Sequence, residues 1–183
     1  MKTIPSLVKL FGLSALSAMF ALFALFATTG VATAAETYPA VINNEGIGFS
    51  RMEDGRVIAY DTVAAYENHE IIVANCDAYK VEHEGISWCF ANAENAQMFS
   101  TAISEGRSNY IPFGGGHCAM GLAAGNLAAR GDPRTAIRIG NALVLNGNFN
   151  VRNQFLTDTE RNMDNGRLRY SLSLDNGSLV PAQ

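Results

Sequence analysis

The sequence predicts a small single α+β domain in which short helices pack on β-hairpins. Apolar and polar residues alternate on both sides of Glu84-Gly85 and of Gly140-Asn141, and this alternation about a short turn is typical of a β-hairpin. Asn92 precedes apolar residues at helical spacing, as the N-cap of a helix would. Helices and hairpins along one short chain predict one α+β core.

The other elements are expected from capping residues and from alternation. The expected strands are 56–60, 79–83, 86–90, 136–139, 142–145 and 168–174, and the expected helices are 62–66, 93–99 and 151–163. Asp61 and Asn150 are predicted N-caps, because short polar side chains accept hydrogen bonds from the first turn of a helix. Asn165-Gly166 is expected to close the last helix before a final strand.

The alternation of residues along the first hairpin determines which side chains share a face. Tyr79, Val81, Trp88 and Phe90 share one side, which we expect to face the core. Cys89 is then expected on the opposite side, half-exposed.

The N-terminal residues resemble an export signal. Lys2 and Lys9 precede an apolar run from Leu10 to Ala27, and Ala32-Thr33-Ala34 forms a small-residue cleavage site. Residues 1–34 are therefore predicted to be a signal peptide, and residues 35–183 an exported domain, periplasmic or secreted. The alternative is a retained membrane anchor, since a span needs about 20 apolar residues. After cleavage we expect no stable membrane span.

The charge of the chain narrows the classes of partner. Without Lys2 and Lys9 the formal charge of −4 becomes −6, and the basic residues are few and scattered. Nucleic acid is therefore not an expected partner. The roughly 150 remaining residues suffice for one domain with a core.

The stretch from Tyr110 to Gly125, YIPFGGGHCAMGLAAG, concentrates unusual chemistry. His117, Cys118 and Met120 combine the ligand types that select Cu(I) or Zn²⁺ over Mg²⁺ or Ca²⁺. A short helix with His117 and Cys118 in its first turn would end at Gly125, and its N-terminus favours a thiolate. Gly115 or Gly116 is expected at positive φ, whereas Gly106 lies in a polar loop with no such demand.

Each of these residues also has a plain structural interpretation. Taken alone, His117 would be a solvent-facing loop residue and Cys118 a small buried side chain. Neighbouring residues on a helix do not share a face, so His117 and Cys118 could bind one ion only if the backbone is irregular.

Three cysteines leave two arrangements open in an exported chain. Either Cys76 and Cys89 form a disulfide and Cys118 stays free, or a metal ion holds the thiols. Composition alone does not choose between them.

Several motifs, taken in order, resemble the YHS-domain family, and its exported bacterial branch in particular. They are the Tyr60 to Tyr66 segment (YDTVAAY), the hairpin 79–90, the helix start at 90–95 (FANAEN), Tyr110-Ile111-Pro112 and the loop 115–119 (GGHCA). The downstream half, with Asp132-Pro133 and the hairpin at 141–148, also resembles that branch. The match covers roughly residues 60–155, and the C-terminal residues form an extension. His117 departs from the pattern, because the exported branch often has an aromatic residue there, and Cys76 and Cys89 are additions.

Two functions follow from these observations. The resemblance implies heavy-metal handling, especially of copper, so the first is binding of copper or zinc by Cys118, with His117 and Met120 as helpers. The second is a periplasmic structural or partner-binding module without metal, stabilised by a Cys76–Cys89 disulfide. Cys118 and His117 could form a thiolate–imidazole nucleophile, but the sequence offers no obvious third group to orient them and no fold-specific signature. It also has no Cys-x-x-Cys pair and no phosphate or dinucleotide motif. A binding protein without an organic cofactor is thus favoured over an enzyme.

Overall fold

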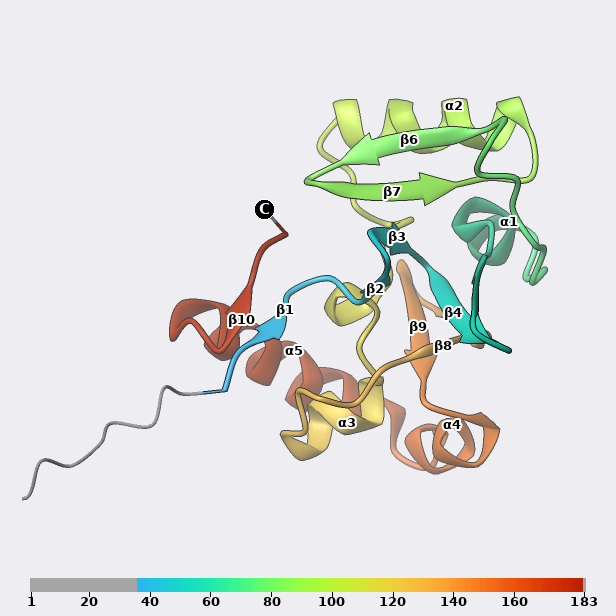
Figure 1. The fold of residues 1–183 in the computed structure, drawn as a ribbon. Helices are drawn as coiled ribbons and strands as arrows, with labels where there is room; N and C mark the ends of the chain where they lie inside the picture. The colour runs from blue at the N-terminus through green and yellow to red at the C-terminus, as the bar shows by residue number, and fades with distance from the viewer. Residues whose placement is uncertain (1–35, 183) are drawn as a thin grey trace, which may run out of the picture. The chain divides into compact units, whose positions relative to one another are not determined.

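The computed structural model describes residues 36–182, and the expected signal peptide lies outside these residues (Figure 1). The strands are β1 (Tyr38–Pro39), β2 (Asn43–Asn44), β3 (Ile47–Gly48), β4 (Ser50–Glu53), β5 (Arg56–Ala59), β6 (Lys80–His83), β7 (Ile86–Cys89), β8 (Asp132–Ile139), β9 (Ala142–Asn146) and β10 (Leu179–Val180). The helices are α1 (Thr62–Glu67), α2 (Ala93–Ser104), the 3₁₀ helix η1 (Phe113–Gly116), α3 (Ala119–Ala124), α4 (Phe149–Leu156) and α5 (Thr159–Asp175). Short helices and short sheets therefore make an α+β domain, as the sequence predicts.

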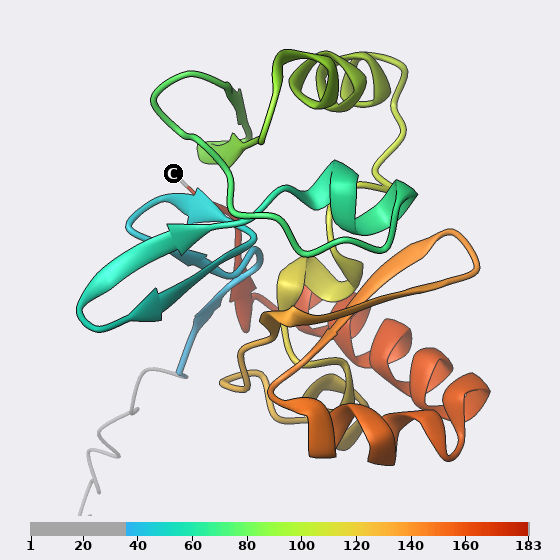
Figure 2. The ribbon, with the colours of Figure 1, turned by 90° about the vertical axis from the view of Figure 1, so that its right-hand side faces the viewer.

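The first expected hairpin is present as β6 and β7. These strands pair antiparallel, and β7 also pairs in parallel with β3, which gives the order β2-β3-β7-β6. Helix α2 runs along β6 in Figure 1 and lies beside the hairpin in Figure 2. Trp88 and Phe90 are buried under it and pack against Phe99 of α2. The predicted core face of the hairpin is confirmed.

Strand β9 joins two hydrophobic clusters. Leu143 and Leu145 belong to the larger cluster, which includes Trp88, Phe90 and Phe99. Val144, between them, belongs to a smaller cluster with Ala119 and Phe155. Because successive side chains of a strand point to opposite faces, β9 is covered on both sides and reads as a continuous apolar run.

The C-terminal third differs from the prediction. The expected helix at 151–163 is two helices, and Asn148 rather than Asn150 caps α4. The expected strand at 168–174 lies inside the long helix α5, so that prediction is wrong. The buried positions on α5 are Asn162, Met163, Gly166 and Ser173, a stripe of mainly small and polar residues. Its packing against α3 is therefore not marked by an apolar pattern.

Within residues 36–182, no helix is both long enough and apolar enough to span a bilayer.

Candidate functional site

The Gly-rich loop folds as η1, and its glycines have the expected unusual backbone. Gly114, Gly115 and Gly116 all have positive φ, which confirms the prediction for this loop. A Cβ on Gly115 would overlap the carbonyl oxygen of Ala40, so the two chain segments approach as only glycine permits. The carbonyl of Gly115 accepts a hydrogen bond from Ile42 N at 2.7 Å. The loop is therefore fastened to the N-terminal segment of the domain.

His117 is fully buried, which corrects its interpretation as a solvent-facing residue. Its Nε2–H donates to the carbonyl oxygen of Pro39 at 2.9 Å, and its Nδ1 has no partner among the described residues. Burial lowers the pKa of His117 below its ordinary value; the hydrogen bond to Pro39 and a contact with the Leu127 backbone, which is not a hydrogen bond of normal geometry, oppose this shift, and the charge of Arg130 adds to it. His117 therefore sits as a neutral imidazole that ties the loop to β1.

Gly125 ends α3 in the left-handed conformation, as predicted, but Cys118 is the N-cap of this helix and His117 precedes it, so neither residue lies in the first turn as expected. The thiol is 4% exposed. Its Sγ accepts hydrogen bonds from Gly121 N at 3.4 Å and Gly147 N at 3.3 Å, and it lies 4.0 Å from Asn146 Oδ1. By accepting a hydrogen bond from Gly121 N, the thiol caps the helix as a Ser or Thr side chain caps other helices.

Of the three expected metal ligands, Cys118 and Met120 both contact Asn146, whereas the His117 ring contacts Pro39. Met120 packs partly buried against the smaller cluster, and its N–H donates to Asn146. His117 and Cys118 share no hydrogen-bond partner. In the described part of the chain, no three His, Cys, Asp or Glu side chains gather where they could hold an ion. Metal binding through Cys118, His117 and Met120 stays a prediction.

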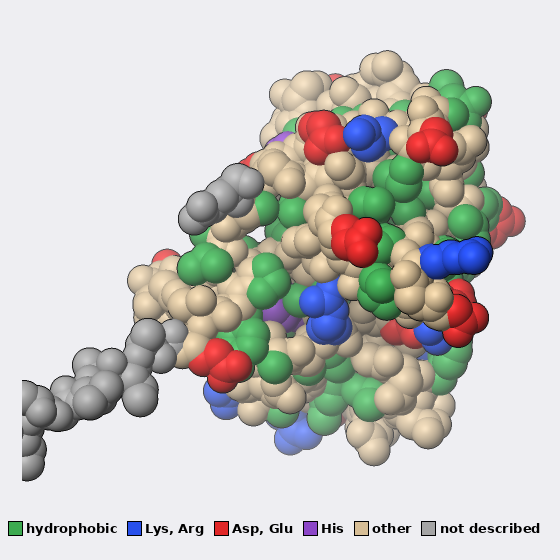
Figure 3. All heavy atoms as spheres, in the orientation of Figure 1, with side chains coloured by type: hydrophobic (Ala, Val, Ile, Leu, Met, Phe, Trp, Pro, Cys, Tyr) green, Lys and Arg blue, Asp and Glu red, His purple; other side chains and the backbone are tan. Residues whose placement is uncertain are grey.

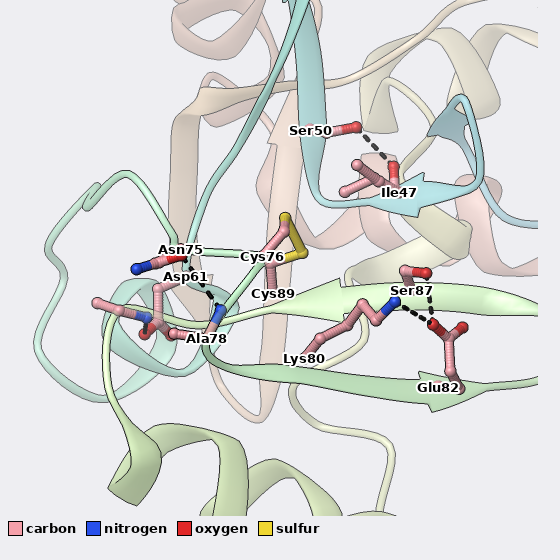
Figure 4. The surroundings of a disulfide bond; sticks show 11 residues. Ile47, Ser50, Asp61, Asn75, Cys76, Ala78, Lys80, Glu82, Ser87 and Cys89 are labelled. Atoms are coloured by element: carbon pink, nitrogen blue, oxygen red, sulfur yellow. Dashed lines mark hydrogen bonds and ion pairs between the residues drawn. A yellow bond between two sulfur atoms is a disulfide. The ribbon is translucent and has the colours of Figure 1, made fainter.

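Cys76 and Cys89 form a disulfide, which resolves the open cysteine arrangement (Figure 4). The bond ties the loop before β6 to the end of β7 across 13 residues of sequence. Cys89 is 2% exposed, so its expected half-exposed position is wrong. The reason is that the loop carrying Cys76 covers this end of the hairpin, and its Asn75 N bonds Phe90 O at 2.9 Å. Cys118 is the free cysteine of the described residues.

Asp61 links two segments that the quoted motifs contain, the start of α1 and the start of α2. Its carboxylate is fully buried and accepts from Ala64 N at 2.9 Å, from Ala91 N at 2.7 Å and from Asn95 Nδ2 at 2.7 Å. These bonds cap α1, as predicted, and hold the start of α2 beside it. The motif residues Asp61 and Asn95 therefore have a structural role, because a buried carboxylate requires such donors.

Two surface hollows that share Arg107 as a lining residue were not foreseen, and we call them together the Arg107 groove. The polar hollow, about 480 Å³, is lined by Tyr66, Arg107, Ser108, Asn109 and Asn141. The other hollow, about 310 Å³, is lined by Glu94, Gln97, Met98, Thr101, Arg107 and Tyr110. The residues of the whole Arg107 groove come from α1, α2, the loop after α2 and the turn of the second hairpin. No sequence motif marks such a set, because it forms only when these elements pack together.

The residues of the groove include charged groups that are already paired and one buried polar atom that lacks a hydrogen-bond partner. Asn109 Oδ1 is buried without a partner among the described residues. Arg107 pairs with exposed Glu105 at 2.6 Å, and the Arg138 guanidinium lies 4.2 Å from the Tyr66 ring centre. Burial and a 2.6 Å hydrogen bond to the Glu67 carboxylate raise the pKa of Tyr110 to about 12. Tyr110 is thus a neutral wall of the groove at physiological pH.

Comparison of the chain with protein-family models, with curated proteins and with solved structures found no match in any of the three.

Proposed function

We propose that this chain is an exported, YHS-like binding module that holds an extended segment of a partner protein in the Arg107 groove. The observation that carries the proposal is that Arg107 lines both a hollow containing Met98 and Tyr110 and a hollow walled by the polar residues Ser108, Asn109 and Asn141. Binding sites in proteins combine apolar walls with a few placed polar groups in this way. The Cys76–Cys89 disulfide stabilises the scaffold.

The groove specifies the chemistry of the partner segment. An extended peptide carries backbone N–H and C=O groups, and the polar side chains of Ser108, Asn109 and Asn141 are the groups that can hydrogen-bond with them. An apolar side chain fits against Met98 and the Tyr110 ring, and an acidic side chain fits Arg107. The Arg107–Glu105 pair is an exposed ion pair, and such pairs contribute about 0–1 kcal/mol, so a partner carboxylate can replace Glu105.

The test uses defined peptides and matched variants. Blocked hexapeptides with one apolar and one acidic residue are titrated against the protein by fluorescence polarisation, and the same peptides with Lys replacing the acid serve as controls. We expect saturable binding of the acidic set only, weakened by Arg107→Gln and by Met98→Ser. Arg161→Gln on α5, where Arg161 pairs with Asp158, is the charge-matched control. Equal binding of both peptide sets, or no saturable binding, would refute the proposal.

A second candidate function, binding of Cu(I) at Cys118, is favoured by one observation. The Nδ1 atom of His117 has no hydrogen-bond partner among the described residues, and His117 is the residue before Cys118, whose thiol is free. Cu(I) is the ion proposed, because it prefers the soft sulfur ligands of Cys and Met. Cys118 would be the central ligand, with His117 and Met120 as helpers.

One equivalent of Cu(I) or Zn²⁺ is added to the parent protein and to Cys118→Ala. Tight Cu(I) binding that the variant loses supports this second function. Equal and weak binding by both proteins excludes it.

A further inference from the structure

A third hollow, away from the Arg107 groove, opens beside β4. Its volume is about 320 Å³, and its walls include Asn44, Arg51, Arg130, Asp132 and Gly147. These residues come from β2, β4, the start of β8 and the segments before β8 and after β9. The hollow therefore depends on the tertiary arrangement of five chain segments.

The guanidinium group of Arg130 is anchored through one of its nitrogen atoms. Its Nη2 donates to Asn43 O at 2.5 Å and to Asn44 Oδ1 at 3.0 Å, and its backbone pairs with His117 in an isolated bridge. No other atom of its guanidinium has a hydrogen-bond partner among the described residues. Since Arg carries five N–H donors in a fixed plane, several of them stay available to a ligand.

Arg51 is a second cation with an incomplete partner. Its side chain is 21% exposed, and its Nη1 reaches Glu53 Oε1 only at 3.4 Å. This is longer than a charge-assisted hydrogen bond, which is about 2.7–2.9 Å. The charge of Arg51 is therefore only weakly compensated by Glu53.

The carboxylate in this hollow is already committed to another partner. Asp132 accepts from Arg134 N at 3.0 Å, Arg134 Nε at 3.2 Å and Arg134 Nη2 at 2.7 Å. Burial opposes ionisation of Asp132, but these bonds and the charges of Arg134 and Arg51 hold its pKa below the ordinary value. Asp132 is thus ionised and paired with Arg134, and the long contact from Arg51 to Glu53 is the ion pair left to the other two arginines of the hollow among the described residues.

We propose that this hollow binds an oxyanion, the phosphate or carboxylate group of a small molecule, between Arg51 and Arg130. Guanidinium groups bind such anions through paired N–H donors, and Arg130 is already oriented by Asn43 and Asn44. The chain as a whole is acidic, with a formal charge of −4. Figure 3 shows acidic and basic side chains interspersed over one face. Recognition therefore depends on this local pair of arginines and not on a broad positive field.

The experiment is calorimetric titration of the full protein with inorganic phosphate and, separately, with citrate at low salt. We expect one saturable site for at least one anion, with affinity about tenfold weaker in Arg51→Gln because a charged hydrogen-bond partner is lost. Arg130→Gln should weaken binding similarly, and amide NMR shifts should map to residues 44–52 and 130–132. Binding by phosphate alone indicates a phosphorylated ligand, and binding by citrate alone indicates a carboxylate.

Arg130→Gln also removes contacts to Asn43 and Asn44 and can destabilise the domain. Arg51→Gln carries the test because Arg51 has only the long contact to Glu53. Arg161→Gln is the control and should bind as the parent does. Absence of saturable binding of either anion in the millimolar range, or equal loss in all three variants, would overturn the proposal. Neither result bears on the Arg107 groove.

Discussion

Gly115→Ala should destabilise the domain more than alanine at two other glycines with positive φ. All three positions, Gly106, Gly115 and Gly116, have positive φ, between +63° and +84°. A Cβ at Gly106 meets no atom within 4 Å, and one at Gly116 comes no closer than 3.7 Å to Ile42. At Gly115 it overlaps the Ala40 carbonyl. The comparison therefore isolates close approach from backbone conformation.

The magnitudes follow from these contacts. Positive φ costs a non-glycine residue about 1–2 kcal/mol, and this applies to all three variants. At Gly115 the Ala40 segment must also move, which breaks the Ile42 N–Gly115 O bond of 2.7 Å and the Tyr170 Oη–Ala40 O bond of 3.0 Å. At about 1 kcal/mol for each bond, Gly115→Ala should lose about 3–4 kcal/mol of unfolding free energy.

The assay is urea unfolding of the parent, Gly115→Ala, Gly116→Ala and Gly106→Ala. With a slope of about 1–3 kcal/mol per molar urea, the midpoint of Gly115→Ala should lie about 1 M below those of the controls. Gly106 was expected from the sequence to be an unconstrained loop residue, but its φ of +71° shows that it carries the backbone demand as well. Equal midpoints for the three variants would show that the contact with Ala40 contributes nothing to stability.

Three further outcomes are expected. Reduction of the Cys76–Cys89 disulfide, which spans 13 residues of sequence, should lower the free energy of unfolding by about 3 kcal/mol. The measurement is the melting temperature, which should fall when the parent protein is reduced but not when the double Ala variant is reduced. Because the folded-state pKa of His117 lies below 6.5, stability should be lost as the pH falls below that value, and a His117→Gln variant should lose less between about pH 7.5 and about pH 5. A slope equal to that of the parent would contradict this. Asp61→Ala should cost about 3 kcal/mol or more by leaving three donors without their acceptor, whereas Ala at exposed Asp77 should have little effect in the same denaturation assay.

Local chemistry in the sequence determined the elements whose signals act over a few residues. Asp61 and Asn92 cap helices because their side chains accept hydrogen bonds from N–H groups three residues ahead. The hairpin around Glu84-Gly85 forms because alternation and turn residues agree. The glycines after Phe113 adopt positive φ because other residues rarely can.

Tertiary packing decided the rest, and α5 shows why. Leu168 and Leu172 are 58% and 52% exposed, so the apolar alternation that predicts a strand does not mark buried positions. The buried face of α5 instead includes Gly166, where an added Cβ would lie 3.1 Å from Phe113. The helix packs closely against Phe113 because glycine has no side chain. Likewise, the surroundings of His117, the Arg107 groove and the Arg51–Arg130 hollow each combine distant segments. No local pattern encodes them, since their chemistry depends on which surfaces the folded chain brings together.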